Sequence, residues 1–228
     1  MILISQPFGI GDAIFCQSIA QYFISKGHEV MWPVKEHYLN DLQKAYPQIK
    51  WVKETDVPAQ WLKYKWKKTI QHLGQEVTVI PLRWANEIMR VPYKDCMRAK
   101  FHLMKMDWTT WKDHAMWLRS ETEIKVPDEP FNLISNVFGS DFQHKANIKV
   151  KNGLKNIYIK QTPGKSLFDW ASLMEQATEI HFVSSSNIYL LEMLNLVAKK
   201  ICIYKREPVE HSHVNYEYIL KSHEYKLM

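Results

Sequence analysis

Apolar positions along the chain alternate between short continuous runs and longer stretches with helical spacing. Residues 2–6 form the first run and predict a buried strand, and residues 12–25 carry apolar side chains at the spacing of a helix. Strands that alternate with helices in this way are typical of a parallel sheet of the Rossmann type. The alternation continues through strands predicted over residues 28–34, 49–54 and 76–82 and helices over 37–47 and 61–68.

The middle of the chain departs from this rhythm. Residues 84–123 are rich in Met, Trp, Lys and Arg, and they predict two helices, over 95–106 and 108–123. The sequence VPDEP at 126–130 then brings two prolines and two acidic residues together, as in a linker. We therefore expect a first unit over residues 1–125, with the helical segment 84–123 inserted in it, and a second over 131–228.

The second half repeats the strand and helix alternation. The expected fold class is thus α/β, with two Rossmann-like parallel-sheet halves and a helical middle insertion. A polar, helix-prone tail is expected over residues 209–228. The other predicted elements are strands over 131–139, 156–160, 179–185 and 200–206, a short edge strand over 146–150, and helices over 166–177 and 187–198.

The composition is that of a globular protein. Of 228 residues, 46% are hydrophobic and 24% charged, and no apolar run reaches the eighteen residues of a membrane span. Glycines and an aspartate interrupt the N-terminal apolar stretch, unlike the layout of a signal peptide. The three cysteines lie far apart. We expect a cytoplasmic protein with reduced thiols and no membrane span.

The chain is basic, with a formal net charge of +6, and part of the excess lies in WLKYKWKK at 61–68. Lysines interleaved with aromatic residues can bind single-stranded nucleic acid. The alternative is a solvated helix face whose aromatic side chains reach the core, and we favour it, so nucleic acid is not the expected partner. A basic surface also suits anionic small molecules such as nucleotide diphosphates.

The first strand-to-helix junction carries Gly9, Gly11 and Asp12 in the sequence GIGD. Glycines at the start of a helix let a ligand approach the backbone, and helix amides favour an anion there. The pattern does not continue as G-x-G-x-x-G, which disfavours a dinucleotide-binding dehydrogenase. Asp12 is either a functional carboxylate or a cap of the helix.

The GIGD sequence followed by an apolar helix resembles the N-terminus of the heptosyltransferase-like glycosyltransferases, which have two Rossmann domains (the GT-B architecture). The resemblance implies that Asp12 is the base that deprotonates the acceptor hydroxyl. Residues 177–208 are similar to the donor-binding segment of that family, in which a strand, a polar turn and a helix hold the diphosphate. This chain has serines where the family usually has Asp-Ser-Gly, and no glycine or histidine follows at the place where the family has them.

In this second segment the candidate ligands of a diphosphate are hydroxyls and amides at a helix start. The alternative for them is a plain helix cap. Lysines nearby would add positive charge, and Glu192 is a candidate for ribose hydroxyls, with a solvated helix-face residue as its alternative. The candidate substrate-binding residues are Gly9, Gly11, Lys160, Lys165, Ser184, Ser185, Ser186, Asn187 and Glu192.

The sequence thus predicts a metal-independent glycosyltransferase that moves a sugar from a nucleotide-sugar donor to an acceptor hydroxyl, if the chain is an enzyme. No cofactor is expected, because lysines and helix amides would carry the charge of the leaving group. Two alternatives stay open. One is a non-catalytic nucleotide- or sugar-binding protein of the same fold, and the other is a nucleic-acid-binding protein that uses residues 61–68.

Overall fold

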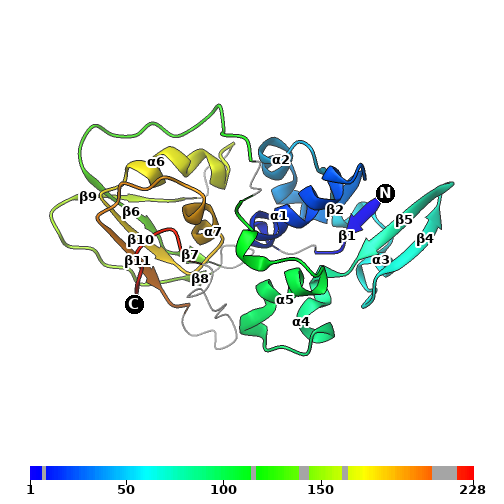
Figure 1. The fold of residues 1–228 in the computed structure, drawn as a ribbon. Coiled ribbons are helices and arrows are strands. Elements are labelled where there is room, and N and C mark those ends of the chain that lie inside the picture. Colours follow the sequence, from blue (N-terminus) through cyan, green and yellow to red (C-terminus); the bar gives the residue numbers. More distant parts are fainter. Residues whose placement is uncertain (7–8, 114–116, 139–143, 161–163, 207–219) are drawn as a thin grey trace. The chain divides into compact units, whose positions relative to one another are not determined.

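The computed structural model describes residues 1–6, 9–113, 117–138, 144–160, 164–206 and 220–228. Its contacts divide the chain into two compact units, Met1–Leu118 (unit 1) and Arg119–Met228 (unit 2). Each unit contains a sheet with parallel strands and helices (Figure 1). The α/β class with two Rossmann-like halves is therefore confirmed.

Sheet A of unit 1 has the strand order β3-β2-β1-β5-β4. Its neighbouring strands are parallel except for β4 and β5, which form an antiparallel hairpin. The order runs outward from β1 in one direction and resumes with β5 on the other side, so the switch point of the topology lies between β1 and β5. The strands are β1 (Ile2–Ile4), β2 (Val30–Val34), β3 (Lys50–Lys53), β4 (Lys68–His72) and β5 (Gln75–Ile80).

Helices α1 and α2 of unit 1 differ in how much of their surface is buried, as their sequence patterns indicate. Helix α1 is apolar on almost every face and is largely buried, whereas α2 buries only Tyr38, Leu42 and Ala45, which follow helical spacing. No helix among the described residues is both long and apolar enough to cross a bilayer. The helices are α1 (Ile10–Ser25), α2 (Glu36–Ala45), α3 (Ala59–Leu62), α4 (Ala85–Ile88) and α5 (Cys96–Leu103).

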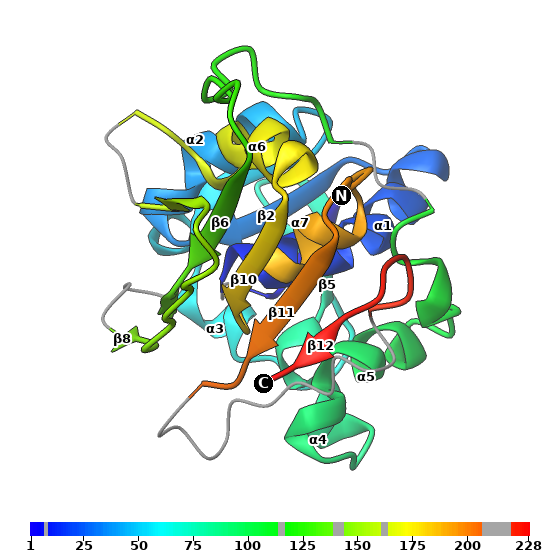
Figure 2. The ribbon, with the colours of Figure 1, turned by 90° about the vertical axis from the view of Figure 1, so that its left-hand side faces the viewer.

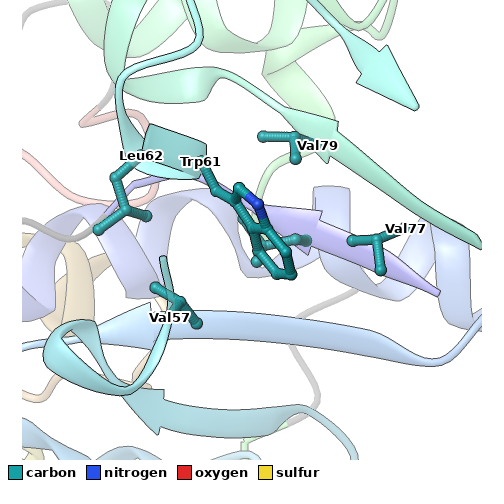
Figure 3. Packing of buried hydrophobic residues seen from close by; sticks show 6 residues of the cluster. Val57, Trp61, Leu62, Val77 and Val79 are labelled. Atoms are coloured by element: carbon teal, nitrogen blue, oxygen red, sulfur yellow. The ribbon is translucent and has the colours of Figure 1, made fainter. Parts of the chain in front are cut away.

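Trp61 is the centre of one core cluster of unit 1. Its indole is 5% exposed, and Figure 3 shows it among side chains from β5 and from the segment before and within α3. Tyr64 packs against the same cluster and is partly buried. The expectation that aromatic residues of 61–68 reach the core is met by these two. The buried members of the cluster are Leu3, Val57, Trp61, Leu62, Val77 and Val79.

The helix predicted over residues 61–68 is wrong. Helix α3 ends at Leu62, and a turn and a bend over residues 63–66 lead to β4, which begins at Lys68. Lysines and aromatic residues alternate with a period of two in this segment, which does not suit a helix that buries one face. The hairpin partner β5 supplies the backbone hydrogen bonds, and the sequence pattern did not reveal β4.

The helical middle segment is shorter than predicted. Helix α5 covers most of the first predicted helix, but 108–123 contains only a short 3-10 turn at Trp108–Thr110 among its described residues. The side chain of Asp107 accepts a hydrogen bond from the amide of Thr109 at 2.9 Å. Further along, Ser120 and Thr122 donate to the carboxylate of Asp169, and these bonds hold the chain in a non-helical path.

Sheet B of unit 2 is entirely parallel, with the order β12-β11-β10-β6-β9. Figure 2 shows β6, β10, β11 and β12 side by side. Counted along the chain this is the order 2-1-3-4-5 of doubly wound folds, with its switch point between β6 and β10. The strands are β6 (Phe131–Ser135), β9 (Lys155–Tyr158), β10 (Glu179–Val183), β11 (Lys200–Tyr204) and β12 (Lys226–Leu227), and a separate hairpin pairs β7 (Val137–Phe138) with β8 (His144–Lys145).

Helices α6 (Ala171–Gln176) and α7 (Asn187–Glu192) connect the strands of sheet B. Both are shorter than predicted, and the 3-10 turn Leu167–Trp170 precedes α6. Residues 146–150 are not a strand: the pairing lies at β8, and Ile148 is buried in a core cluster with Phe138. The described part of the predicted tail ends in β12 and contains no helix, while residues 209–219 lie outside the described residues.

Residues 119–125 belong to unit 2 by their contacts. Arg119 pairs with Glu175 at 2.9 Å, and the amide of Ile124 donates to the carbonyl of Asp169. Asp169 also completes a capping box with Ser166, which precedes this helical region. The link between the two units therefore lies before the VPDEP sequence.

Candidate functional site

The N-terminus of α1 lies at the switch point of sheet A. Helix α1 begins at Ile10, two residues earlier than predicted, so Gly11 and Asp12 lie in its first turn and only Gly9 precedes it. The backbone of Gly9 is extended, and a Cβ atom added there would meet no other atom within 4 Å. Neither the backbone conformation nor the packing requires a glycine at this position. The lack of a side chain at Gly9 leaves open space beside the amides of the helix N-terminus.

Asp12 forms an ion pair with Lys100 from α5. The ammonium Nζ of Lys100 donates a hydrogen bond to Oδ1 of Asp12. The Lys100 side chain is only 5% exposed, whereas that of Asp12 is 24% exposed. Asp12 does not cap the helix, because its carboxylate binds this lysine, so the capping alternative is wrong.

The surroundings of Lys100 keep its amine charged. Burial acts to lower the pKa of Lys100, but the negative charge of Asp12 and the hydrogen bond to its carboxylate outweigh it, and the pKa lies above its ordinary value. Burial raises the pKa of the Cys16 thiol to about 12, and it also raises that of Cys96. Both cysteines therefore stay as neutral thiols, and the pair of ions at α1 carries no net charge.

The second group of candidates lies at the carboxyl ends of β10 and β6, which is the switch point of sheet B. The side-chain amide of Asn187 donates to the Ser135 hydroxyl at 2.6 Å and so joins the ends of the two strands. Ser184 and Ser185 are 2% and 8% exposed, and their hydroxyls have no hydrogen-bond partner among the described residues. Buried hydroxyls without a partner are costly unless a ligand or water completes them.

Arg206 lies beside these serines. Its Nε donates to the backbone carbonyl of Ser184, and its guanidinium lies 5.8 Å from the ring centroid of Phe138. Ser186 precedes α7 but makes no side-chain capping bond, which argues against the plain helix cap. We call the group Ser135, Ser184, Ser185, Asn187 and Arg206 the serine edge of sheet B.

The other sequence candidates are placed differently. Glu192 is buried, and its carboxylate accepts hydrogen bonds from the amide of Ser222 at 3.1 Å and the hydroxyl of Tyr225 at 2.5 Å. It holds the C-terminal segment and is not a solvated residue. The ammonium of Lys165 donates to the carbonyl of Thr122 at 2.5 Å. Lys160 is exposed two residues after β9.

Sequence reasoning named neither Arg206 nor Lys100 as a site residue. Arg206 is the second residue after β11, and a basic residue that follows a parallel strand next to a serine turn was the available signal. Lys100 had no comparable signal, because 88 positions separate it from Asp12 and only the fold brings the two together. No three His, Cys, Asp or Glu side chains gather as metal ligands within the described ranges.

The chain was compared with known proteins. No family model and no curated protein matches it. Among solved structures it is similar to the bacterial iron-containing dodecameric glycosyltransferase TibC from enterotoxigenic E. coli H10407, with 14% identity and a TM-score of 0.53 over 90% of this chain. A second structure, of the heptosyltransferase TibC in complex with ADP-D-beta-D-heptose, matches with the same identity and TM-score. The chain spans 57% and 58% of the length of these two structures. The likeness shows a glycosyltransferase-like fold.

Proposed function

We propose that the chain is a metal-independent glycosyltransferase that uses a nucleotide-sugar donor. The observation that carries the proposal is the serine edge, where two buried hydroxyls that have no partner in the described part of the chain lie next to a guanidinium at the switch point of a parallel sheet. In open α/β sheets ligands bind at this place. Hydroxyl donors and a guanidinium together suit a diphosphate. The likeness to TibC, which was solved with a nucleotide sugar, supports the same substrate class.

In this proposal unit 2 binds the donor diphosphate and unit 1 supplies the base. Asp12 removes the proton of the acceptor hydroxyl, and the oxygen attacks the anomeric carbon of the sugar as the bond to the diphosphate breaks. Arg206 and the serine hydroxyls stabilise the charge of the departing diphosphate. Gly9 leaves the N-terminus of α1 open to the acceptor, and Lys100 fixes the orientation of the carboxylate.

One observation favours the alternative of a binding protein without catalytic activity. The carboxylate of Asp12 already has a buried cation as its partner, and an ion pair of this kind can serve the fold alone. Both functions require the serine edge to bind a nucleotide, so they differ only in what Asp12 does.

The first experiment measures nucleotide binding by the full chain. Thermal stabilisation by ADP, UDP, GDP and their sugar derivatives selects the ligand, and calorimetry then compares the wild type with Arg206→Met. Loss of the guanidinium should weaken binding by roughly tenfold or more, since hydrogen bonds to charged groups contribute about 1.5–3 kcal/mol. Arg83→Met in unit 1 is the matched control. Equal affinity in Arg206→Met would end the assignment of the donor site.

The second experiment separates enzyme from binding protein. Transfer of sugar to a panel of acceptors should be abolished in Asp12→Asn, while nucleotide affinity stays at the wild-type level. A wild-type chain that binds the nucleotide sugar tightly and transfers sugar to no acceptor supports the binding protein instead.

A further inference from the structure

The tip of the β4–β5 hairpin carries an apolar side chain that is not buried in the core. Leu73 is 92% exposed. His72 pairs with Gln75, so Leu73 and Gly74 form a two-residue turn, and both have positive φ, at 47° and 76°. This is the pattern of a type I′ turn, in which Asn-Gly is the favoured pair. Leucine is disfavoured in that conformation, so the position is both strained and exposed.

The tip extends beyond the rest of sheet A. Strand β1 begins at Ile2, opposite Thr78, so residues 71–76 of the hairpin have only each other as strand partners in the sheet. β4 is the last strand of the sheet order. Figure 1 shows the hairpin reaching away from α1 and α2. The leucine thus lies at the end of a projecting hairpin.

The approach to β4 is strongly basic. Lys63, Lys65, Lys67 and Lys68 are all exposed, and between residues 63 and 76 the sequence holds one acidic residue, Glu76. Trp66 lies among these lysines with 69% of its surface exposed. Lys65 pairs with Glu87 at 2.9 Å, so the charge of this lysine is partly neutralised. Residues 63–76, named here the basic hairpin, therefore combine four lysines with two exposed apolar side chains.

We propose that the basic hairpin docks unit 1 on an anionic lipid bilayer. Lysines near such a surface are attracted by the charge of the headgroups, tryptophan favours the membrane interface, and a leucine at a projecting tip can enter the acyl boundary. The argument rests on charge complementarity and on the apolar tip, and it is independent of the proposed function. It accounts for a leucine where the turn itself favours asparagine.

Single-stranded nucleic acid fits the hairpin less well. Binding of that kind uses several exposed rings on which successive bases stack. Here Trp61 is buried, the ring of Tyr64 lies 4.6 Å under the ammonium of Lys68, and Trp66 alone of these three is largely exposed. Leu73 would have no part in stacking.

The test is co-sedimentation of the full chain with vesicles of phosphatidylcholine, with or without phosphatidylglycerol, at several salt concentrations. We expect binding to the anionic vesicles alone, weakened by salt. Leu73→Asn and Trp66→Ala should each reduce partitioning roughly tenfold by removing an apolar contact, and Lys67→Glu by about fivefold or more. Because asparagine suits the turn, Leu73→Asn should keep or raise the Tm, which separates lost docking from lost folding.

Val197→Asn and Lys151→Glu, exposed positions in unit 2, are the matched controls and should leave partitioning unchanged. Three results would overturn the proposal. The first is equal binding to neutral and anionic vesicles, and the second is unchanged partitioning of Leu73→Asn. The third is a lack of binding to either kind of vesicle, together with tight, salt-dependent binding of single-stranded DNA. If Trp66→Ala abolished that DNA binding and Leu73→Asn did not, the hairpin would be assigned to nucleic acid.

Discussion

The junction of β1 with α1 in unit 1 and that of β10 with α7 in unit 2 lie at equivalent places in their sheets, but their polar groups are satisfied in different ways. In unit 1 the carboxylate of Asp12 has a buried ammonium as partner. In unit 2 the hydroxyls of Ser184 and Ser185 have no partner among the described residues. The carboxylate of the first junction thus has its partner within the protein, although Oε1 of Gln6, just after β1, has none among the described residues. The hydroxyls of the second junction would be completed by a ligand. The difference teaches that topology marks a binding place, and the local hydrogen bonding indicates whether a ligand is needed there.

The largest expected effect is on the ion pair of unit 1. Asp12→Asn leaves the buried Lys100 without its counter-ion, and we expect a loss of about 3–5 kcal/mol in the free energy of unfolding. Chemical denaturation at pH 7 measures it. Glu36→Gln, which breaks the exposed pair with Lys53, is the control and should change stability little. A loss in Asp12→Asn no larger than in Glu36→Gln would mean that Lys100 is not buried.

The pH dependence of stability tests the same ion pair of Asp12 and Lys100. In the wild type the pKa of Lys100 is raised in the folded state, so the contribution of the pair is present below the unfolded value of about 10.4 and is lost as the pH rises above it. In Asp12→Asn burial alone should lower the pKa of Lys100, and stability should then rise with pH up to about 10.4. Denaturation curves between pH 7 and 11 test this. Parallel pH profiles for the two proteins would contradict it.

A smaller effect is expected for the buried carboxylate of unit 2. Glu192→Gln weakens the acceptor of the Ser222 amide and the Tyr225 hydroxyl, and we expect a loss of about 1–3 kcal/mol, with faster hydrogen exchange at residues 226–228. Glu224→Gln, at an exposed neighbouring position, is the control. Nucleotide affinity should not change. A nucleotide affinity that falls with stability intact would restore Glu192 as a ribose ligand.

The smallest expected effect is on the serine edge. Ser184→Ala and Ser185→Ala remove hydroxyls for which the described residues offer no partner, so the free energy of unfolding should stay the same or rise slightly. Nucleotide affinity should fall by about twofold to tenfold for each change, since one hydrogen bond contributes about 0.5–1.5 kcal/mol. Calorimetry and denaturation of the same variants give both numbers. A stability loss with unchanged affinity would make the serines structural.

The alternation of strands and helices was predictable from sequence because apolar periodicity reports burial directly. The prediction of helices and strands failed where an interaction with another part of the chain determined the backbone conformation. Thr122 lies in a predicted helix, yet its hydroxyl binds Asp169, 47 positions away. Lys68 begins a strand because β5 pairs with it, and no local pattern reveals such a pairing.

The residues of the candidate site also divide into those that the sequence marked and those that it did not. The glycines and serines that follow buried strands marked the two junctions, because a strand followed at once by a helix fixes their place at the edge of a sheet. Lys100 reaches the first junction from 88 positions away. Its position depends on tertiary packing, and one sequence does not contain that information in readable form. Arg206 follows Ser184 by 22 positions, and its place directly after a parallel strand was the signal that could have marked it.

The distance in sequence between Asp12 and Lys100 has a consequence for synthesis on the ribosome. Domains fold as units from the N-terminus while the chain emerges at about 5–20 residues per second. All strands of sheet A have been made by Ile80, but the ammonium that pairs with Asp12 arrives only with α5, 88 positions after the carboxylate. In the nascent chain Asp12 therefore stays hydrated until α5 emerges. The arrival of Lys100 then supplies the counter-ion of Asp12, and co-translational completion of unit 1 depends on a helix that lies outside its sheet.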